Sequence, residues 1–162
     1  MRTNRIILPV ITFASEQVEQ WTFTGWIPWM ERASLGRMRF GLAGVYLLAH
    51  FAQPPRDSGN VMAEEIIYIG ATHGRSFKAC WQRVHDSAFE GQDKHAAGIA
   101  YREIFGDDGR TLYVAASPQT ESTYHLASRP SIASIALHLA IKKQLLTAYQ
   151  KKWGRKPACN RK

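Results

Sequence analysis

The chain has 162 residues, of which 45% are hydrophobic, and its 21 Lys and Arg residues outnumber its 13 Asp and Glu residues, a formal charge of +8. This length supports one domain with a hydrophobic core and is short for two. The basic balance favours a polyanionic partner such as nucleic acid over an acidic small molecule. Many of the basic residues follow residue 141, where they form either a nucleic-acid contact or a solvated helix face and tail.

Membrane-spanning and metal-ligand patterns are both missing from the sequence. No apolar run approaches the roughly 18 residues of a transmembrane helix, and the short N-terminal run IILPVI predicts no signal peptide. Cys80 and Cys159 have no Cys or His partners at zinc-ligand spacing, so neither a disulfide framework nor a structural metal is predicted. We therefore expect a soluble, intracellular, cytoplasmic protein without a membrane partner.

Residues 1–40 are predicted to form an N-terminal extension packed on the core. Arg5–Phe13 has the composition of a strand interrupted by Pro9, and a tryptophan-rich segment follows it before the basic stretch Arg32–Arg39. Closely spaced tryptophans either stack on nucleic-acid bases or pack an appendage onto a small domain. The packing interpretation is the favoured one for Trp21, Trp26 and Trp29.

Two strand-like segments each place a tyrosine near a glycine. Gly44–Phe51 contains Tyr46, and Glu65–Ala71 contains Tyr68 directly before Ile69 and Gly70. The stretch 53–60 between them is rich in turn-forming residues, so the two segments predict a hairpin with paired tyrosines. A purely structural interpretation, with both tyrosines in the core, stays open at this point.

The elements that follow predict a mixed domain. Apolar residues recur at helical spacing over 76–89, and a polar segment leads to a short helix or strand at 99–105. Residues 111–116 predict a third strand, 118–130 a loop, and a long helix begins after the N-cap candidate Ser131 and ends at Gly154. This order predicts an α+β (mixed α/β) fold with a small, mainly antiparallel, three-stranded sheet flanked by helices.

This order of motifs resembles the GIY-YIG nuclease family. The tyrosine hairpin is followed by a helix with Arg83, a third strand, a long helix, and then Pro157 and Asn160. The resemblance covers about residues 40–160 and implies a nuclease-like domain over 41–162, with Gly44 and Gly70 as its motif glycines. It also implies that DNA is the partner, and RNA remains an alternative.

The resemblance implies catalytic roles for three residues. Phosphodiester hydrolysis needs a base, cations around the phosphate, and usually a divalent metal. By matching position, Tyr46 is the candidate general base, Tyr68 contacts phosphate or water, and Arg83 clamps the phosphate. A phenol ionises near pH ~10, so Tyr46 can act as a base only if nearby cations lower its pKa.

Four further residues are candidates for the site. His85 is a catalytic candidate because some family members place a histidine or lysine near the arginine, although residues two apart lie on different sides of a helix. His95 either contacts phosphate or is a surface histidine, and Lys143 is a candidate nucleic-acid contact. Asn160 matches the family's terminal asparagine, which either braces the site or is simply solvated.

Lys142 is the main departure from the family's pattern. The family carries a metal-binding glutamate three and four residues before an aliphatic pair, and here the pair Leu145-Leu146 places Lys142 at that position. The resemblance implies Mg²⁺ or Mn²⁺, but an ammonium offers no oxygen ligand to a hard cation. Our hypothesis is that Lys142 supplies the positive charge of the metal, so that phosphate binding survives and water activation is lost. Carboxylates that could substitute are Glu64, Glu65, Glu90 and Glu121.

Three functions remain open from the sequence. The first is a GIY-YIG-like endonuclease acting on DNA phosphodiesters, impaired by Lys142. The second is a non-catalytic nucleic-acid-binding module on the same scaffold. The third is a protein-interaction domain whose tyrosines belong to the core and whose charge is incidental.

Overall fold

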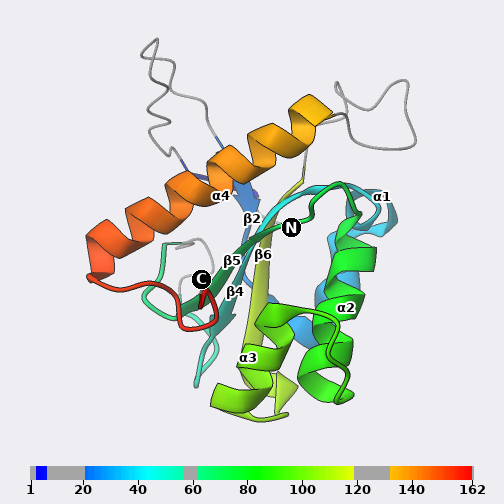
Figure 1. Ribbon diagram of the computed structural model, residues 1–162, viewed down its shortest axis with the longest axis vertical. Coiled ribbons are helices and arrows are strands. Elements are labelled where there is room, and N and C mark those ends of the chain that lie inside the picture. Colours follow the sequence, from blue (N-terminus) through cyan, green and yellow to red (C-terminus); the bar gives the residue numbers. More distant parts are fainter. Residues whose placement is uncertain (1–2, 7–20, 57–61, 119–131, 162) are drawn as a thin grey trace.

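The computed structural model describes residues 3–6, 21–56, 62–118 and 132–161, and the statements below concern these residues (Figure 1). The fold is α+β, as predicted. A four-stranded antiparallel sheet has the order β3-β6-β4-β5, and a separate two-stranded sheet pairs β1 (Thr3–Ile6) with β2 (Trp21–Thr24). Among the described residues, no helix is sufficiently long and apolar to cross a membrane.

The tyrosine hairpin forms the centre and one edge of the main sheet. Strands β4 (Gly44–His50) and β5 (Ile66–Ala71) pair so that Tyr46 lies opposite Gly70. Strand β6 (Leu112–Pro118) pairs with the other side of β4. Because β4 has a neighbour on each side and cover on both faces, every residue from Gly44 to Ala49 is buried.

The prediction of three strands was wrong by one. The fourth, β3 (Ile27–Pro28), pairs with β6 and comes from the segment predicted as an extension. Two residues are too few to show the alternation that marks a strand, and Pro28 has no N–H to donate. Residues 21–40 thus contribute to the main sheet and its core, and the division of the chain at residue 40 stays a prediction.

The tryptophans described in this segment pack in the core. Trp26 is 6% exposed and Trp29 is fully buried at the start of the 3₁₀ helix η1 (Trp29–Leu35), which the short helix α1 (Arg37–Phe40) follows. The packing interpretation is therefore confirmed for Trp26 and Trp29, and the side chain of Trp21 lies outside the described residues.

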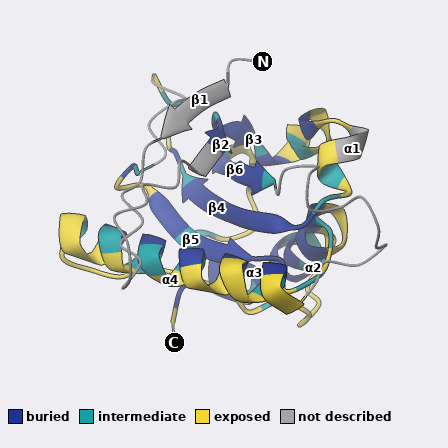
Figure 2. Cartoon of the chain, turned by 90° about the horizontal axis from the view of Figure 1, so that it is seen from above, coloured by how far each residue is buried: buried dark blue, intermediate teal, exposed yellow. Residues whose placement is uncertain are grey.

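Helices cover the two faces of the main sheet separately. Helices α2 (Phe77–Phe89) and α3 (Ala96–Phe105) pack on the face that carries Tyr46, and α4 (Ile132–Trp153) packs on the opposite face (Figures 1 and 2). A Cβ on Gly98 would lie 2.5 Å from the Val84 carbonyl oxygen, so this glycine lets α3 approach the backbone of α2. The helix α3 resolves the helix-or-strand alternative for 99–105.

The ends of the helices follow local capping chemistry. The Ser76 hydroxyl accepts a hydrogen bond from the Ala79 N–H and caps α2 where the sequence predicted its start. Gly154 has a φ of +70° and ends α4, also as predicted. The 3₁₀ helix η2 (Gly109–Thr111) precedes β6. Ser131 and the expected loop before it lie outside the described residues.

The C-terminal segment covers the edge of β5. The Cys159 N–H donates to the Ile67 carbonyl at 2.7 Å. The Asn160 side chain completes the pairing, because its Oδ1 accepts from the Ile69 N–H at 2.9 Å and its Nδ2 donates to the Ile69 carbonyl at 3.0 Å. The exposed edge of a sheet is thereby closed by hydrogen bonds of the type that another strand would make.

Candidate functional site

The two motif tyrosines lie together on the α2/α3 face of the sheet. The ring centroids of Tyr46 and Tyr68 are 5.9 Å apart. Gly70 makes room for them, since a Cβ there would lie 2.4 Å from Tyr68 Cε1 and 2.7 Å from Tyr46 Cζ. Gly44 is required for another reason, because its Cβ would meet the backbone oxygen of Ser117 at 2.2 Å. Both motif glycines thus have a packing reason.

The Tyr46 hydroxyl is enclosed by protein. The residue is fully buried, and its Oη lies 3.5 Å from Cys80 Sγ and 3.5 Å from His95 Nε2. Burial raises the pKa of Tyr46 well above its ordinary value, and the nearby Cys80 and Tyr68 raise it further. A general base would need the opposite shift, so the arrangement lacks the lowered pKa that the catalytic role of Tyr46 requires.

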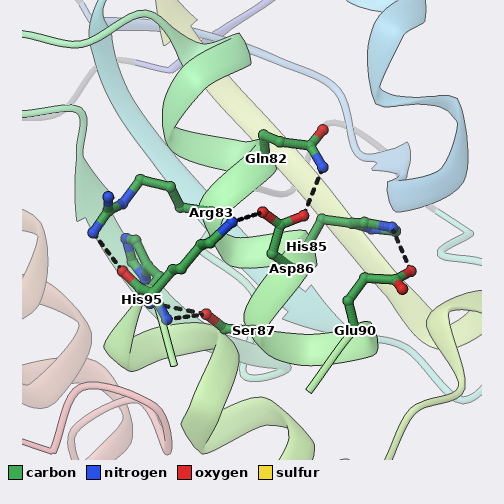
Figure 3. A network of polar contacts seen from close by, with 8 residues as sticks. Gln82, Arg83, His85, Asp86, Ser87, Glu90 and His95 are labelled. Atoms are coloured by element: carbon green, nitrogen blue, oxygen red, sulfur yellow. Dashed lines mark hydrogen bonds and ion pairs between the residues drawn. The ribbon is translucent and has the colours of Figure 1, made fainter. Parts of the chain in front are cut away.

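His95 comes to the site as the N-cap of α3. Its Nδ1 accepts the Ala97 N–H at 3.2 Å, which leaves the ring proton on Nε2, facing Tyr46 and Cys80. The buried Ser87 hydroxyl accepts the N–H groups of Lys94 and His95 at 2.9 and 2.8 Å and fixes this turn (Figure 3). His95 is therefore half-buried beside the tyrosines and is not a fully exposed surface histidine.

Four cationic or titratable side chains act on His95. Burial, together with the charges of Arg83, Lys142, His73 and Arg75, lowers the pKa of His95 to about 4. Lys142 Nζ lies 5.9 Å from the centre of the Tyr68 ring, and burial lowers the pKa of this ammonium. The structure thus brings together Tyr46, Tyr68, Arg83, His95 and Lys142 from the predicted set.

Arg83 has a structural role as well as its charge. Its Nη2 donates to the Lys94 carbonyl at 2.6 Å, and its buried Nε has no hydrogen-bond partner among the described residues. Figure 3 shows Arg83 and His95 on the same side of α2. The guanidinium therefore holds the turn that carries His95 while it adds positive charge to the site.

His85 lies on a different side of α2. The Trp29 Nε1–H donates to His85 Nδ1 at 3.2 Å, and His85 Nε2 lies 3.8 Å from a Glu90 oxygen. Figure 3 shows His85 pointing toward Glu90 and away from Arg83 and His95. The structure does not bring His85 to the tyrosine pair. The α2 residue whose side chain meets the Tyr46 hydroxyl is Cys80, which the sequence pattern assigned to packing alone.

His73 and Arg75 were also missed. Both are exposed in the turn between β5 and α2, where His73 adopts a positive φ of 50°. The signal that could have found them is position. Both lie in the loop after the strand that carries the Tyr68-Ile69-Gly70 motif, and binding residues are frequent on loops that a rigid element positions.

The described residues do not fit a divalent metal at this site. They contain no group of three His, Cys, Asp or Glu side chains that could hold a metal ion. No Asp or Glu is among the groups that shift the pKa values of Tyr46, Tyr68, Cys80, His95 or Lys142. A hard cation needs oxygen ligands, and Lys142 instead adds a positive charge.

The glutamates that could replace a metal ligand at position 142 lie away from the tyrosine pair or outside the described residues. Glu64 lies 3.5 Å from Arg155, Glu90 faces His85, and Glu65 is exposed near the start of β5. Glu121 is outside the described residues. The described glutamates therefore supply no replacement for the carboxylate expected at position 142.

A cavity of about 390 Å³ adjoins the tyrosine pair. Its walls come from β5, α3, α4 and the C-terminal segment: Tyr68, Ala96, Ile99, Ala100, Lys142, Cys159, Asn160 and Arg161. Asn160 therefore both closes the β5 edge and forms a wall of this cavity. Lys143, the other predicted contact on α4, is exposed and is not one of the lining residues.

His95 should make stability depend on pH. The unfolded chain protonates this residue below about pH 6.5, whereas folded His95 stays neutral down to about pH 4. Stability should rise with pH across this window, by about 2 kcal/mol after allowance for partial exposure. Burial also lowers the pKa values of His73, His85 and His138, so stability should rise with pH in both proteins. In urea unfolding the rise should be steeper for the chain than for His95→Asn, which can still cap α3. Equal pH dependence in both would contradict the neutral, buried state of His95.

Comparison with known proteins gives no similar protein from which the site could be interpreted. No protein-family model, no curated protein and no solved structure matches the chain.

Proposed function

We propose that this chain binds nucleic acid through its phosphates at the cationic site around Tyr68, without hydrolysing them. The observation that carries the proposal is the concentration of positive charge from Arg75, Arg83 and Lys142 where no carboxylate contributes. Uncompensated cations beside a cavity attract polyanions, and Lys and Arg neutralise the phosphates of nucleic acids in this way. The GIY-YIG-like scaffold is part of the same proposal.

Binding without cleavage follows from the chemistry of three side chains. The pKa of Tyr46 is raised, so the phenol is a poor base at neutral pH. Lys142 repels a metal at the position where the resemblance expects its ligand. The Tyr68 hydroxyl stays protonated as well, since burial raises its pKa to about 12, and it can therefore donate a hydrogen bond to a phosphate oxygen.

The second candidate is a GIY-YIG-like endonuclease. The contact between the two motif tyrosines favours it, because the resemblance places both at the scissile phosphate. That function requires a carboxylate from outside the described residues and predicts nicking of DNA that depends on Mg²⁺ or Mn²⁺. Either function suits a cytoplasmic setting, where free thiols such as those of Cys80 and Cys159 stay reduced.

The proposal is tested by nucleic-acid binding as a function of salt. A fluorescent strand of about 20 nucleotides should bind, and log K should fall linearly with log [salt]. Arg75→Ala should weaken binding about two- to tenfold, whereas Lys151→Ala, which removes an exposed lysine from the last turn of α4, should change it little. Supercoiled plasmid should stay intact in Mg²⁺ or Mn²⁺. Metal-dependent nicking would support the endonuclease, and absence of salt-sensitive binding would overturn both functions in favour of a protein-interaction domain.

A further inference from the structure

The cavity beside Tyr68 has the composition of a pocket for a flat, apolar group attached to an anion. Its apolar lining residues include Ile99 and Ala100 of α3, Cys159 and Tyr68. Its charged groups are Lys142 and Arg161. A volume of about 390 Å³ lies at the small end of the range of about 300–1,000 Å³ typical of ligand pockets. A single nucleotide matches this combination, whereas a duplex is too large to enter.

The hydrogen-bonding groups of the cavity are largely committed to the protein. The Asn160 carboxamide uses its oxygen and its nitrogen on the backbone of Ile69, and Arg161 Nη1 donates to Glu103 Oε2. Few groups remain to read the edge of a base. A base would therefore be held by contact with apolar and aromatic surface, which is tolerant of sequence.

The cavity and the proposed phosphate site share two residues, Tyr68 and Lys142. A strand whose phosphate lies at Lys142 thus has a neighbouring place for one of its own bases. In a duplex this base is stacked and paired, and taking it out costs a few kcal/mol. In a single strand, a bulge or a frayed end this cost is small.

We propose that the cavity takes one unpaired nucleotide, so that the chain prefers single-stranded to duplex nucleic acid and has little base preference. The inference rests on the proposed phosphate binding. It adds the class of substrate: nucleic acid with an unpaired base next to the bound phosphate.

The experiment compares one oligonucleotide as a single strand and as a duplex, with 2-aminopurine as a fluorescent base. The single strand should bind at least tenfold more tightly. Ile99→Trp fills the cavity and should weaken binding of the single strand about tenfold while leaving the duplex little changed. Ile104→Trp is the matched control, because Ile104 lies on the same helix, is 45% exposed and does not line the cavity. This control should bind like the original chain.

Two further measurements make the result decisive. The first is the melting temperature of Ile99→Trp, which shows whether that substitution destabilises the fold. The second is binding by Ala96→Trp, a substitution at an exposed position that also lines the cavity, which should weaken single-strand binding in the same way. The inference would be overturned if single strand and duplex bound with equal affinity and neither Ile99→Trp nor Ala96→Trp changed that affinity. Salt-dependent binding in the same experiment would still support the proposed function. Loss of all binding in the original chain would overturn the proposed function itself.

Discussion

Replacing Lys142 by glutamate should reduce the affinity for a single-stranded oligonucleotide about 100-fold at moderate salt, and replacing it by methionine about tenfold. Lys142→Met removes one phosphate contact, which should also lower the salt slope by about 0.7 for a single strand. Lys142→Glu adds repulsion of the phosphates to that loss. The side chain is half-buried over the Tyr68 ring, so its charge is less screened than that of an exposed lysine. Titration of a labelled strand at several salt concentrations measures both effects.

Lys151→Glu is the matched control for this charge reversal. It changes the charge by the same amount on the same helix, and nine residues of α4 turn Lys151 to the opposite side of the helix from Lys142. Its effect should stay below about threefold. Equal losses from both glutamates would show a diffuse effect of net charge and contradict a localised site. Cleavage of plasmid by Lys142→Glu in Mg²⁺ would instead establish that the site is a nuclease centre disabled by one residue.

The elements around the site could be predicted because their signals are local. The hairpin of Tyr46 and Tyr68 combines apolar strands with a turn-forming stretch, and the helix over 76–89 shows apolar residues at helical spacing. Strand β3 could not be predicted, since its two residues become a strand only by pairing with β6. That pairing is a long-range property, because Ile27 lies opposite Val114.

The inner contacts of the site were harder to predict than its elements. Cys80 shares the apolar face of α2 with Phe77 and Trp81, so nothing in its spacing separates packing from contact with Tyr46. The sequence leaves His95 either as a phosphate contact or as a surface histidine, and its partial burial depends on the hydrogen bonds of the turn to the Ser87 hydroxyl. Both residues acquire their positions from tertiary contacts.

The same contacts change how the site should be probed. The sequence predicts that Arg83 binds phosphate, but in the structure its Nη2 donates a hydrogen bond to the Lys94 carbonyl. Arg83→Ala would therefore loosen the turn before His95 as well as remove a charge, and a loss of binding would not separate the two causes. Arg75 and Lys142 are the sharper probes, since Arg75 is exposed and the described contact of the Lys142 ammonium is with a ring.

Asn160→Asp should destabilise the fold by about 3 kcal/mol at pH 7, more than Asn160→Ala, although the aspartate has almost the same shape. The aspartate can still accept the Ile69 N–H, but its second oxygen would face the Ile69 carbonyl, to which Asn160 Nδ2 now donates at 3.0 Å. Two acceptors then oppose each other at a position that is only 9% exposed. Lys142 and Arg161 line the adjoining cavity and offset part of this cost. The alanine variant loses two hydrogen bonds without a repulsive contact, which should cost less, about 1–2 kcal/mol.

The pH dependence separates repulsion from a mere loss of packing. A protonated carboxyl at position 160 can donate to the Ile69 carbonyl, so folding should raise the pKa of that aspartate above its unfolded value of about 3.9. The folded variant then binds more protons than the unfolded chain, and its stability falls as the pH rises through this window. Measured by urea unfolding relative to the original chain at each pH, the deficit of Asn160→Asp should shrink between about pH 7 and pH 4, whereas that of Asn160→Ala should stay constant. An aspartate variant as stable as the original at pH 7 would show that the carboxamide does not close the β5 edge.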